Sequence, residues 1–201
     1  EPGCGQRKAE TRHADEADDD RALLDDLGHA IGADRVRAEP LELTLYSRDA
    51  GNERGEPAVV CFPESTEHVA AAVAVAARHD RPFLARGSGT GLAGGATPVG
   101  RPVVIVTTRL NRVLEVDAIS RIAWVEPGVL NLDLSRRVRH LGLHSAPDPS
   151  SQAACTIGGN VATNAGGPHC LASGVTTTHV LALDVVLTDG TAYLGVSNNF
   201  R

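Results

Sequence analysis

The stretch RGSGTGLAGGATP, residues 86–98, decides the fold, because so many glycines leave little room for a regular element. Residues 89–94 match the pattern G-x-G-x-x-G, which in dinucleotide-binding folds joins a strand to a helix whose free amide groups hold a pyrophosphate. A helix is not expected to start here, since further glycines and Pro98 follow. The stretch therefore predicts an extended loop rather than a Rossmann turn.

Residues 86–91 of this loop have the chemistry of an anion site. Glycines reach positive φ and bring the main chain close to a ligand, and successive N–H groups form a concave site for an anion. Ser88 and Thr90 add hydroxyl donors, and Arg86 can add positive charge at the rim. A pyrophosphate fits these donors. The alternative is a flexible surface loop whose glycines only turn the chain.

The segments before this loop predict a compact strand, helix and strand. Residues 58–62, AVVCF, form a short apolar run, Ser65 or Thr66 can cap a helix, and residues 82–85, PFLA, form a second run. Two strands joined in this way are expected to be parallel, with a right-handed crossover. An earlier amphipathic helix is predicted by the spacing of Leu23, Leu24, Leu27 and Ile31 before Gly32.

The segments after the loop predict further strands and one helix. The expected elements are a strand at 103–108, paired strands at 112–116 and 121–128 with a turn at 118–120, a helix at 130–141, and a hairpin of 179–188 and 191–195 around Asp189-Gly190.

A second glycine-rich segment, APDPSSQAACTIGGNVATNAGG, spans residues 146–167. Residues 149–183 contain no Asp, Glu, Lys or Arg. Neutral donors and acceptors beside exposed main chain suit a flat, heteroaromatic cofactor in a largely dry cleft, where an unpaired charge would be costly. Only 3% of the residues are aromatic, so the main chain is expected to hold such a group.

Taken together, the two glycine-rich segments resemble the FAD-binding domain of the vanillyl-alcohol oxidase/p-cresol methylhydroxylase (PCMH) family. Within it, the chain is most similar to the branch of the glycolate oxidase flavin subunit and D-lactate dehydrogenases. The resemblance covers about residues 22–195. It implies an α+β, PCMH-type FAD-binding fold, in which a small βαβ lobe and a larger mixed-sheet lobe enclose FAD.

The resemblance also implies the residues that contact the cofactor. The first loop would wrap the FAD pyrophosphate, and the second segment would line the remainder, including the isoalloxazine. Covalently flavinylated relatives carry a His where Thr90 stands, so non-covalent FAD is expected. The implied positions are Arg86, Gly87, Ser88, Gly89, Thr90, Gly91, Pro147, Asp148, Ser150, Thr156, Gly158, Gly159, Ala162, Asn164, Gly166 and Gly167.

Enzymes of this branch oxidise a 2-hydroxy acid, with hydride passing to flavin N5. By resemblance, the base and the substrate carboxylate site belong to a C-terminal substrate domain, sometimes served by an iron–sulfur partner subunit. We expect a disordered acidic tail at 1–20, the FAD-binding domain at 21–195, and a truncated end at 196–201 that lacks the substrate domain and the catalytic residues. The alternatives are an inactive fragment that binds FAD weakly or not at all, and a Rossmann-type NAD enzyme.

Composition excludes several other classes. The 201 residues carry a net charge of −6 and show no basic stripe, which argues against a nucleic-acid partner. The chain is 42% hydrophobic, but no stretch is long and apolar enough to suggest a membrane span. Four cysteines without a C-x-x-C pair and the lack of a signal peptide favour a cytoplasmic protein with reduced thiols. The chain contains no Met, which is consistent with a fragment.

Three remaining candidates have structural alternatives. His140 and His144 have metal-ligand spacing, but Gly142 lies between them and no third ligand is near, so no metal is expected. His169-Cys170 can touch a flavin or form a thiolate, although a partly buried bystander pair is favoured. Asp184 either reaches the adenine side or has the structural role that we favour. No Ser has Gly two residues before and after it, which excludes the hydrolase elbow.

Overall fold

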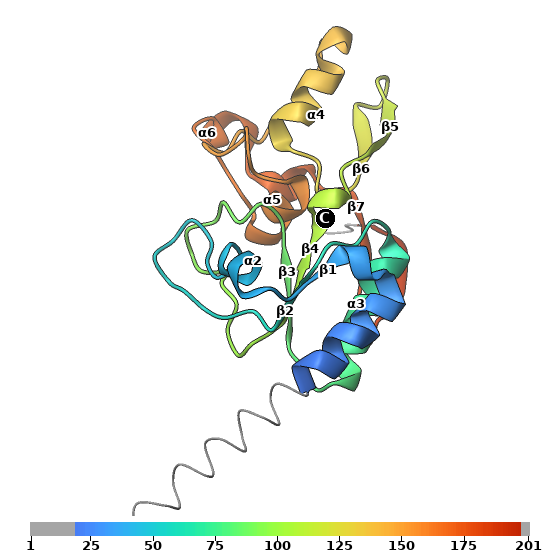
Figure 1. Ribbon diagram of the computed structural model, residues 1–201. Coiled ribbons are helices and arrows are strands. Elements are labelled where there is room, and N and C mark those ends of the chain that lie inside the picture. The colour runs from blue at the N-terminus through green and yellow to red at the C-terminus, as the bar shows by residue number, and fades with distance from the viewer. Residues whose placement is uncertain (1–18, 198–201) are drawn as a thin grey trace, which may run out of the picture.

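The computed structural model describes residues 19–197, and Figure 1 shows a central sheet with helices on one side and glycine-rich segments, small helices and hairpins around the rest. In chain order, with η for 3-10 turns, the elements are a helix over residues 19–31, η1 (Ala33–Arg35), β1 (Val36–Arg37), α2 (Pro40–Thr44), β2 (Val59–Cys61), α3 (Thr66–Arg78), β3 (Phe83–Arg86), β4 (Val103–Val106), η2 (Thr107–Arg109), β5 (Val113–Asp117), β6 (Ile122–Val125), α4 (Asn131–Val138), η3 (Arg139–Leu141), α5 (Ile157–Thr163), α6 (Cys170–Ser173), η4 (Thr176–His179), β7 (Ala182–Val186) and β8 (Ala192–Ser197).

The expected tail and truncated end fall mostly outside the described residues, which exclude 1–18 and 198–201. The two positions of the expected tail that are described, Asp19 and Asp20, belong to the first helix. Asp20 forms ion pairs with Arg81 and Arg101, so this end of the helix is fixed to the segments beside β3 and β4.

The four-stranded sheet has the order β1-β2-β4-β3. Strands β2 and β3 are both parallel to β4, which lies between them, and β1 is antiparallel to β2. The predicted strand, helix and strand are confirmed as β2, α3 and β3. Ser65 is the cap of α3, because its side chain accepts a hydrogen bond of 3.2 Å from the amide of His68.

Alternating side chains of the central strands build a core on each face of the sheet. Val59, Cys61 and Ile105 pack with α3 and the helix of residues 19–31, which cover the same face in Figure 1. The other face carries Val60, Val104 and Val106 beneath Leu43 and Tyr46, from α2 and the segment after it. Helix α2 and the residues just after it therefore contribute to the core.

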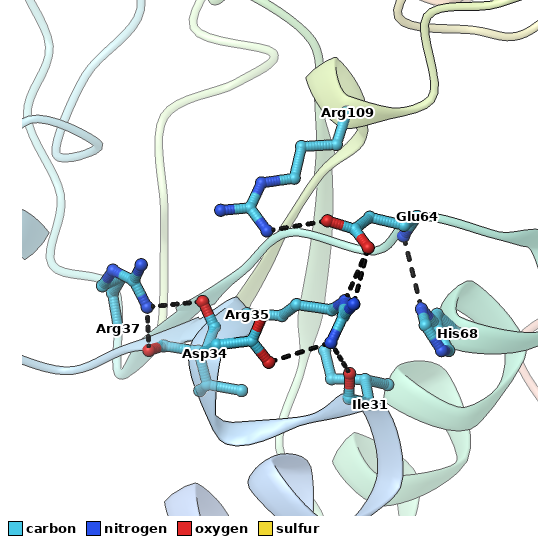
Figure 2. Close-up of polar contacts among 8 residues, drawn as sticks. Ile31, Asp34, Arg35, Arg37, Glu64, His68 and Arg109 are labelled. Atoms are coloured by element: carbon cyan, nitrogen blue, oxygen red, sulfur yellow. Dashed lines mark hydrogen bonds and ion pairs between the residues drawn. The ribbon is translucent and has the colours of Figure 1, made fainter.

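An ion-pair network ties three connections together at one end of the sheet (Figure 2). Glu64, which follows β2, accepts hydrogen bonds from Arg35 of η1 at 2.6 and 2.9 Å and from Arg109 of η2 at 3.0 Å. The Arg35 hydrogen bond is the main reason that the pKa of Glu64 lies below its ordinary value. The Arg109 guanidinium also stacks 5.3 Å from the ring centre of Phe62. These contacts fix the turn that leads from β4 toward β5.

The rest of the described chain contains two hairpins and the glycine-rich helices. Strands β5 and β6 pair antiparallel, as do β7 and β8, so both predicted hairpins are confirmed. The mixed sheet is thus the one that contains β2 and β4, while these hairpins form separate two-stranded sheets. The predicted helix at 130–141 is confirmed as α4 followed by η3.

The second glycine-rich segment is more regular than the sequence indicated. Its centre is the helix α5, which begins after Thr156 and ends at Asn164, a residue in the left-handed conformation with φ of 49°. Among the described residues, no helix is long and apolar enough to cross a membrane.

Candidate cofactor site

The first glycine-rich loop connects the end of β3 to the start of β4 and contains no helix or strand. This confirms the exclusion of a Rossmann turn. Within the described part of the chain, no amide group from Ser88 to Ala96 donates a hydrogen bond. Gly89 and Gly94 adopt φ of 71° and 78°, and a Cβ added at Gly94 or Gly95 would meet nothing within 4 Å. The loop therefore has a run of backbone amides without hydrogen-bond acceptors, and such amides are the donors that bind an anion.

Arg86 lies beneath this loop and not at its rim, where we expected it. Its side chain is buried, and Nη1 donates a hydrogen bond of 2.9 Å to the carbonyl oxygen of Ala96. The guanidinium lies 5.6 Å from the centre of the Tyr46 ring, and a Cβ at Gly89 would come within 2.2 Å of Nη2. Burial lowers the pKa of Arg86, and Tyr46 and Asp49 oppose that shift. The loop thus wraps around a buried cation.

The segment of residues 47–56 supports the outer half of the loop. The amide of Ala50 donates to the carbonyl oxygen of Gly91 at 3.0 Å. Gly55 packs against Pro98 so closely that a Cβ would lie 1.6 Å from the proline carbonyl oxygen. Sequence reasoning missed this support. The glycines at 51 and 55 were an available signal, since an isolated glycine in an irregular segment can mark a close approach of two main chains.

Helix α5 orders the second segment, but its N-terminus is not a free anion site. Thr156 Oγ1 accepts a hydrogen bond of 3.2 Å from Gly159, as expected of an N-cap. The amides of Ile157 and Gly158 donate to the carbonyl oxygens of Val129 and Pro127, both at 2.8 Å. The donors that usually hold an anion at a helix start are already satisfied, so the free amides of the first loop are the stronger candidate for the diphosphate.

The two glycine-rich segments meet at Gly87 and Thr156. A Cβ at Gly87 would lie 2.2 Å from Thr156 Oγ1, so only glycine permits this approach of the first loop to the start of α5. Thr156 is 2% exposed and its hydroxyl caps the helix. The structure therefore brings the two predicted segments into direct contact, although they are distant in the sequence.

The end of the second segment is held by its own contacts. Asp148 pairs with His169, and the hydrogen bond from that ring is the main cause of the lowered pKa of Asp148. The amide of Gly167 donates to the Cys170 sulfur at 2.7 Å. Asn164 Oδ1 accepts from both the amide and the hydroxyl of Thr177 at 3.0 Å. His169 and Cys170 thus stabilise the segment.

The other predicted positions divide into buried and exposed ones. The carbonyl oxygen of Pro147 accepts a hydrogen bond of 3.0 Å from the buried amide group of Asn131, so Pro147 belongs to the interior. Ser150 and Ala162 are exposed on the surface. Asp184 accepts a hydrogen bond of 2.7 Å from the amide of Gly195, which matches the structural role that we favoured.

An open groove of about 870 Å³ begins at Ser88 and continues along the segments around β5 and α4. Its volume lies within the range of sites for small molecules and cofactors. Ser88 is the one predicted residue that lines it, and the other walls were not predicted. The lining residues are Ser88, Thr108, Asn111, Arg112, Val113, Leu114, Gly128, Val129, Leu130, Asp133 and Arg137. Among the described residues, no group of three or more His, Cys, Asp or Glu side chains can hold a metal ion, His140 and His144 included.

Comparison with known proteins identifies the family. Residues 57–193 match the family model described as FAD binding domain, so the chain belongs to this FAD-binding family. The run of free loop amides fits the doubly charged diphosphate of FAD, and the adjoining groove has a suitable size.

Two relatives indicate the branch. Glycolate oxidase subunit GlcD of Escherichia coli (strain K12) is 47% identical over 139 residues, which are 69% of this chain and 28% of that protein. D-lactate dehydrogenase of Anaerostipes hadrus is 39% identical over 149 residues, 74% of this chain and 30% of that protein. The chain therefore spans less than a third of the length of these curated relatives.

Solved structures confirm the expected PCMH-type fold. The 4-ethylphenol oxidase from Gulosibacter chungangensis superposes with a TM-score of 0.74 at 26% identity, over 88% of this chain and 35% of that one. The p-cresol methylhydroxylase structure gives 0.73 at 21% identity, over 87% and 35%, and at that identity it supports the fold alone. The resemblance inferred from the two glycine-rich segments is thus confirmed, and FAD is the cofactor of the family.

Proposed function

We propose that this chain supplies the FAD site of an oxidoreductase acting on a 2-hydroxy acid of the glycolate or D-lactate type. The observation that carries this proposal is the run of unused amides from Ser88 to Ala96, joined to the second segment where Gly87 meets Thr156. The names of the two relatives above support the choice of substrate class.

The loop amides hold the diphosphate, and buried Arg86 adds positive charge beneath them. The groove that starts at Ser88 takes an adjoining part of the cofactor, with Asn111 and Arg137 as donors in its walls. Bound FAD supplies acceptance of a hydride from the substrate α-carbon at flavin N5. Position 90 is a Thr, whose hydroxyl is a weak nucleophile, so we propose that FAD is held non-covalently.

The remaining predicted contacts are kept as part of the proposal. The second segment, from Pro147 to Gly167, lines the remainder of the cofactor, including the isoalloxazine. In the complete enzyme, substrate carboxylate capture and the base that takes the hydroxyl proton are proposed to belong to a separate substrate domain. An iron–sulfur electron-transfer subunit is the proposed partner of the complete enzyme, and the cytoplasm is its proposed location.

The visible spectrum of the purified chain tests the proposal. Flavin absorption bands at about 370 and 450 nm that lose their protein-bound shape on denaturation support the proposed FAD site. If the protein is colourless, FAD and NAD are each added and the unfolding temperature is measured. Stabilisation by FAD supports the proposal, because a ligand that binds only the folded state raises its stability. No response to FAD favours an inactive fragment, and a response to NAD alone contradicts the proposal.

A further inference from the structure

Asp49 is a buried carboxylate beside the first loop, and one of its oxygens has no partner. The residue is 6% exposed, and Oδ1 accepts a hydrogen bond of 2.7 Å from the amide of Gly51. Within the described part of the chain, Oδ2 is buried and makes no hydrogen bond. A Cβ added at Gly91 would lie 3.8 Å from it. Burying a carboxylate is costly unless neighbouring charge compensates it, so the burial of Asp49 needs an explanation.

Arg86 is a buried cation on which Asp49 acts electrostatically. Asp49 and Tyr46 are the two groups whose electrostatic effect on Arg86 favours its charged form. A guanidinium keeps its charge in the interior, where a nearby carboxylate and an aromatic face stabilise it. Arg86 in turn donates to Ala96 and fills the space beneath Gly89, so its position sets the shape of the loop.

Asp49 also starts the turn that holds the loop from outside. Its Oδ1 closes the turn to Gly51, and the residue between them, Ala50, donates to the carbonyl oxygen of Gly91. Both Asp49 and Tyr46 precede residues 57–193, the region that matches the FAD-binding family.

We propose that Asp49 is a positioning residue for the cofactor loop: together with Tyr46 it keeps Arg86 buried beneath Gly89, so that the loop amides stay arranged for the cofactor diphosphate. This inference rests on the proposed function, because it concerns the same site. Asp49 makes no contact with the cofactor in this role.

The sign of the effect separates positioning from simple electrostatics. Removing a negative charge near an anion site tightens anion binding if charge alone matters. If Asp49 positions the loop, Asp49→Asn weakens binding, because Arg86 loses its compensating charge and its place under the loop. The matched control is Glu53→Gln, which removes the same charge from an exposed residue of the same segment.

The experiment measures the Kd of FAD and of ADP by titration calorimetry, together with the unfolding temperature of the ligand-free protein. We expect Asp49→Asn to raise both Kd values about tenfold, because the buried guanidinium loses a nearby negative charge, and Glu53→Gln to leave them within about twofold. Unchanged or tighter binding by Asp49→Asn overturns the inference. If the starting protein binds neither ligand, the proposed function fails and this inference fails with it.

A second pair of variants does not depend on Asp49→Asn folding well. Tyr46→Leu removes the aromatic face beside Arg86 and is expected to weaken both ligands in the same direction. Tyr46→Phe keeps the ring and is expected to retain the affinity. If Kd values change only in step with the unfolding temperature in all of these variants, the role is merely structural and the inference is overturned.

Discussion

The contact between Gly87 and Thr156 predicts a large effect from the smallest substitution, Gly87→Ala. The new methyl group would lie 2.2 Å from Thr156 Oγ1 and 3.3 Å from its Cβ, so the threonine must move. Moving it loses the cap of α5, which costs about 1 kcal/mol, and overpacking adds about 1–3 kcal/mol. We expect a loss of about 2–4 kcal/mol in the free energy of unfolding.

Urea denaturation of the ligand-free protein measures this loss. The double variant Gly87→Ala/Thr156→Ala removes the hydroxyl that the methyl group strikes at 2.2 Å, so it should be at least as stable as Gly87→Ala alone. Thr156→Ala by itself still loses the cap and should cost about 1 kcal/mol. The control is Gly95→Ala in the same loop, where an added Cβ meets nothing within 4 Å and stability should change by less than about 1 kcal/mol.

A double-mutant cycle decides whether the close approach is the cause. Two residues in contact should show a coupling energy of about 1–3 kcal/mol in favour of the double variant. Strictly additive losses, or a Gly87→Ala variant as stable as Gly95→Ala, would refute the idea that this glycine joins the two segments.

Three further outcomes follow from the structure. Acid precipitation should release all flavin from the protein, since position 90 is a Thr, and flavin that stays on the washed pellet would contradict non-covalent binding. Glu126→Gln should cost about 1–3 kcal/mol near neutral pH in urea denaturation. Burial acts to raise the pKa of Glu126, but hydrogen bonds from Arg112 hold it below its ordinary value. The stability that Glu126 contributes is therefore present above its pKa in the unfolded chain and is lost as the pH falls through its pKa in the folded protein. If the variant loses stability on acidification just as the starting protein does, this explanation is wrong. Burial raises the pKa of the Cys61 thiol to about 12, so iodoacetamide should spare Cys61 and modify the partly exposed Cys170 in the folded protein, as peptide mass mapping can show.

The sequence was most informative where local patterns and burial agree. The apolar run before Pro63 became β2, and Ser65 became the cap of α3, because an apolar run and a helix cap are properties of a few neighbouring residues. Both hairpins were predicted for the same reason. The parallel relation of β2 and β3 was also predicted, but the insertion of β4 between them depends on distant pairing that local patterns do not encode.

Helix α5 was missed because its glycines argue against a helix. Gly158 is required for packing: a Cβ there would lie 2.6 Å from the Pro127 side chain and 3.0 Å from its carbonyl oxygen. Contacts with distant residues thus outweigh the low helix propensity of glycine at this position. The rim position expected for Arg86 was wrong for a similar reason, since the guanidinium finds Ala96 and Tyr46 beneath the loop only after folding.

The support by residues 47–56 was missed as well. The apolar residues of this polar segment do not have the spacing of a helix or strand. The segment supports the loop through main-chain contacts with Gly91 and Pro98. The groove along α4 was missed because its walls come from segments that lie apart in the sequence. The predicted cofactor positions themselves stay predictions.

The unused amides from Ser88 to Ala96 have a consequence for how this protein can vary. Peptide groups are common to all residues, so exchanging one exposed side chain for another in this stretch leaves the donors in place. Drift in the identity of Leu92 or Ala93 should therefore be well tolerated, whereas an inserted or deleted residue would shift the whole row of donors at once. A site of this kind tolerates substitutions of its exposed side chains but not insertions or deletions in the loop.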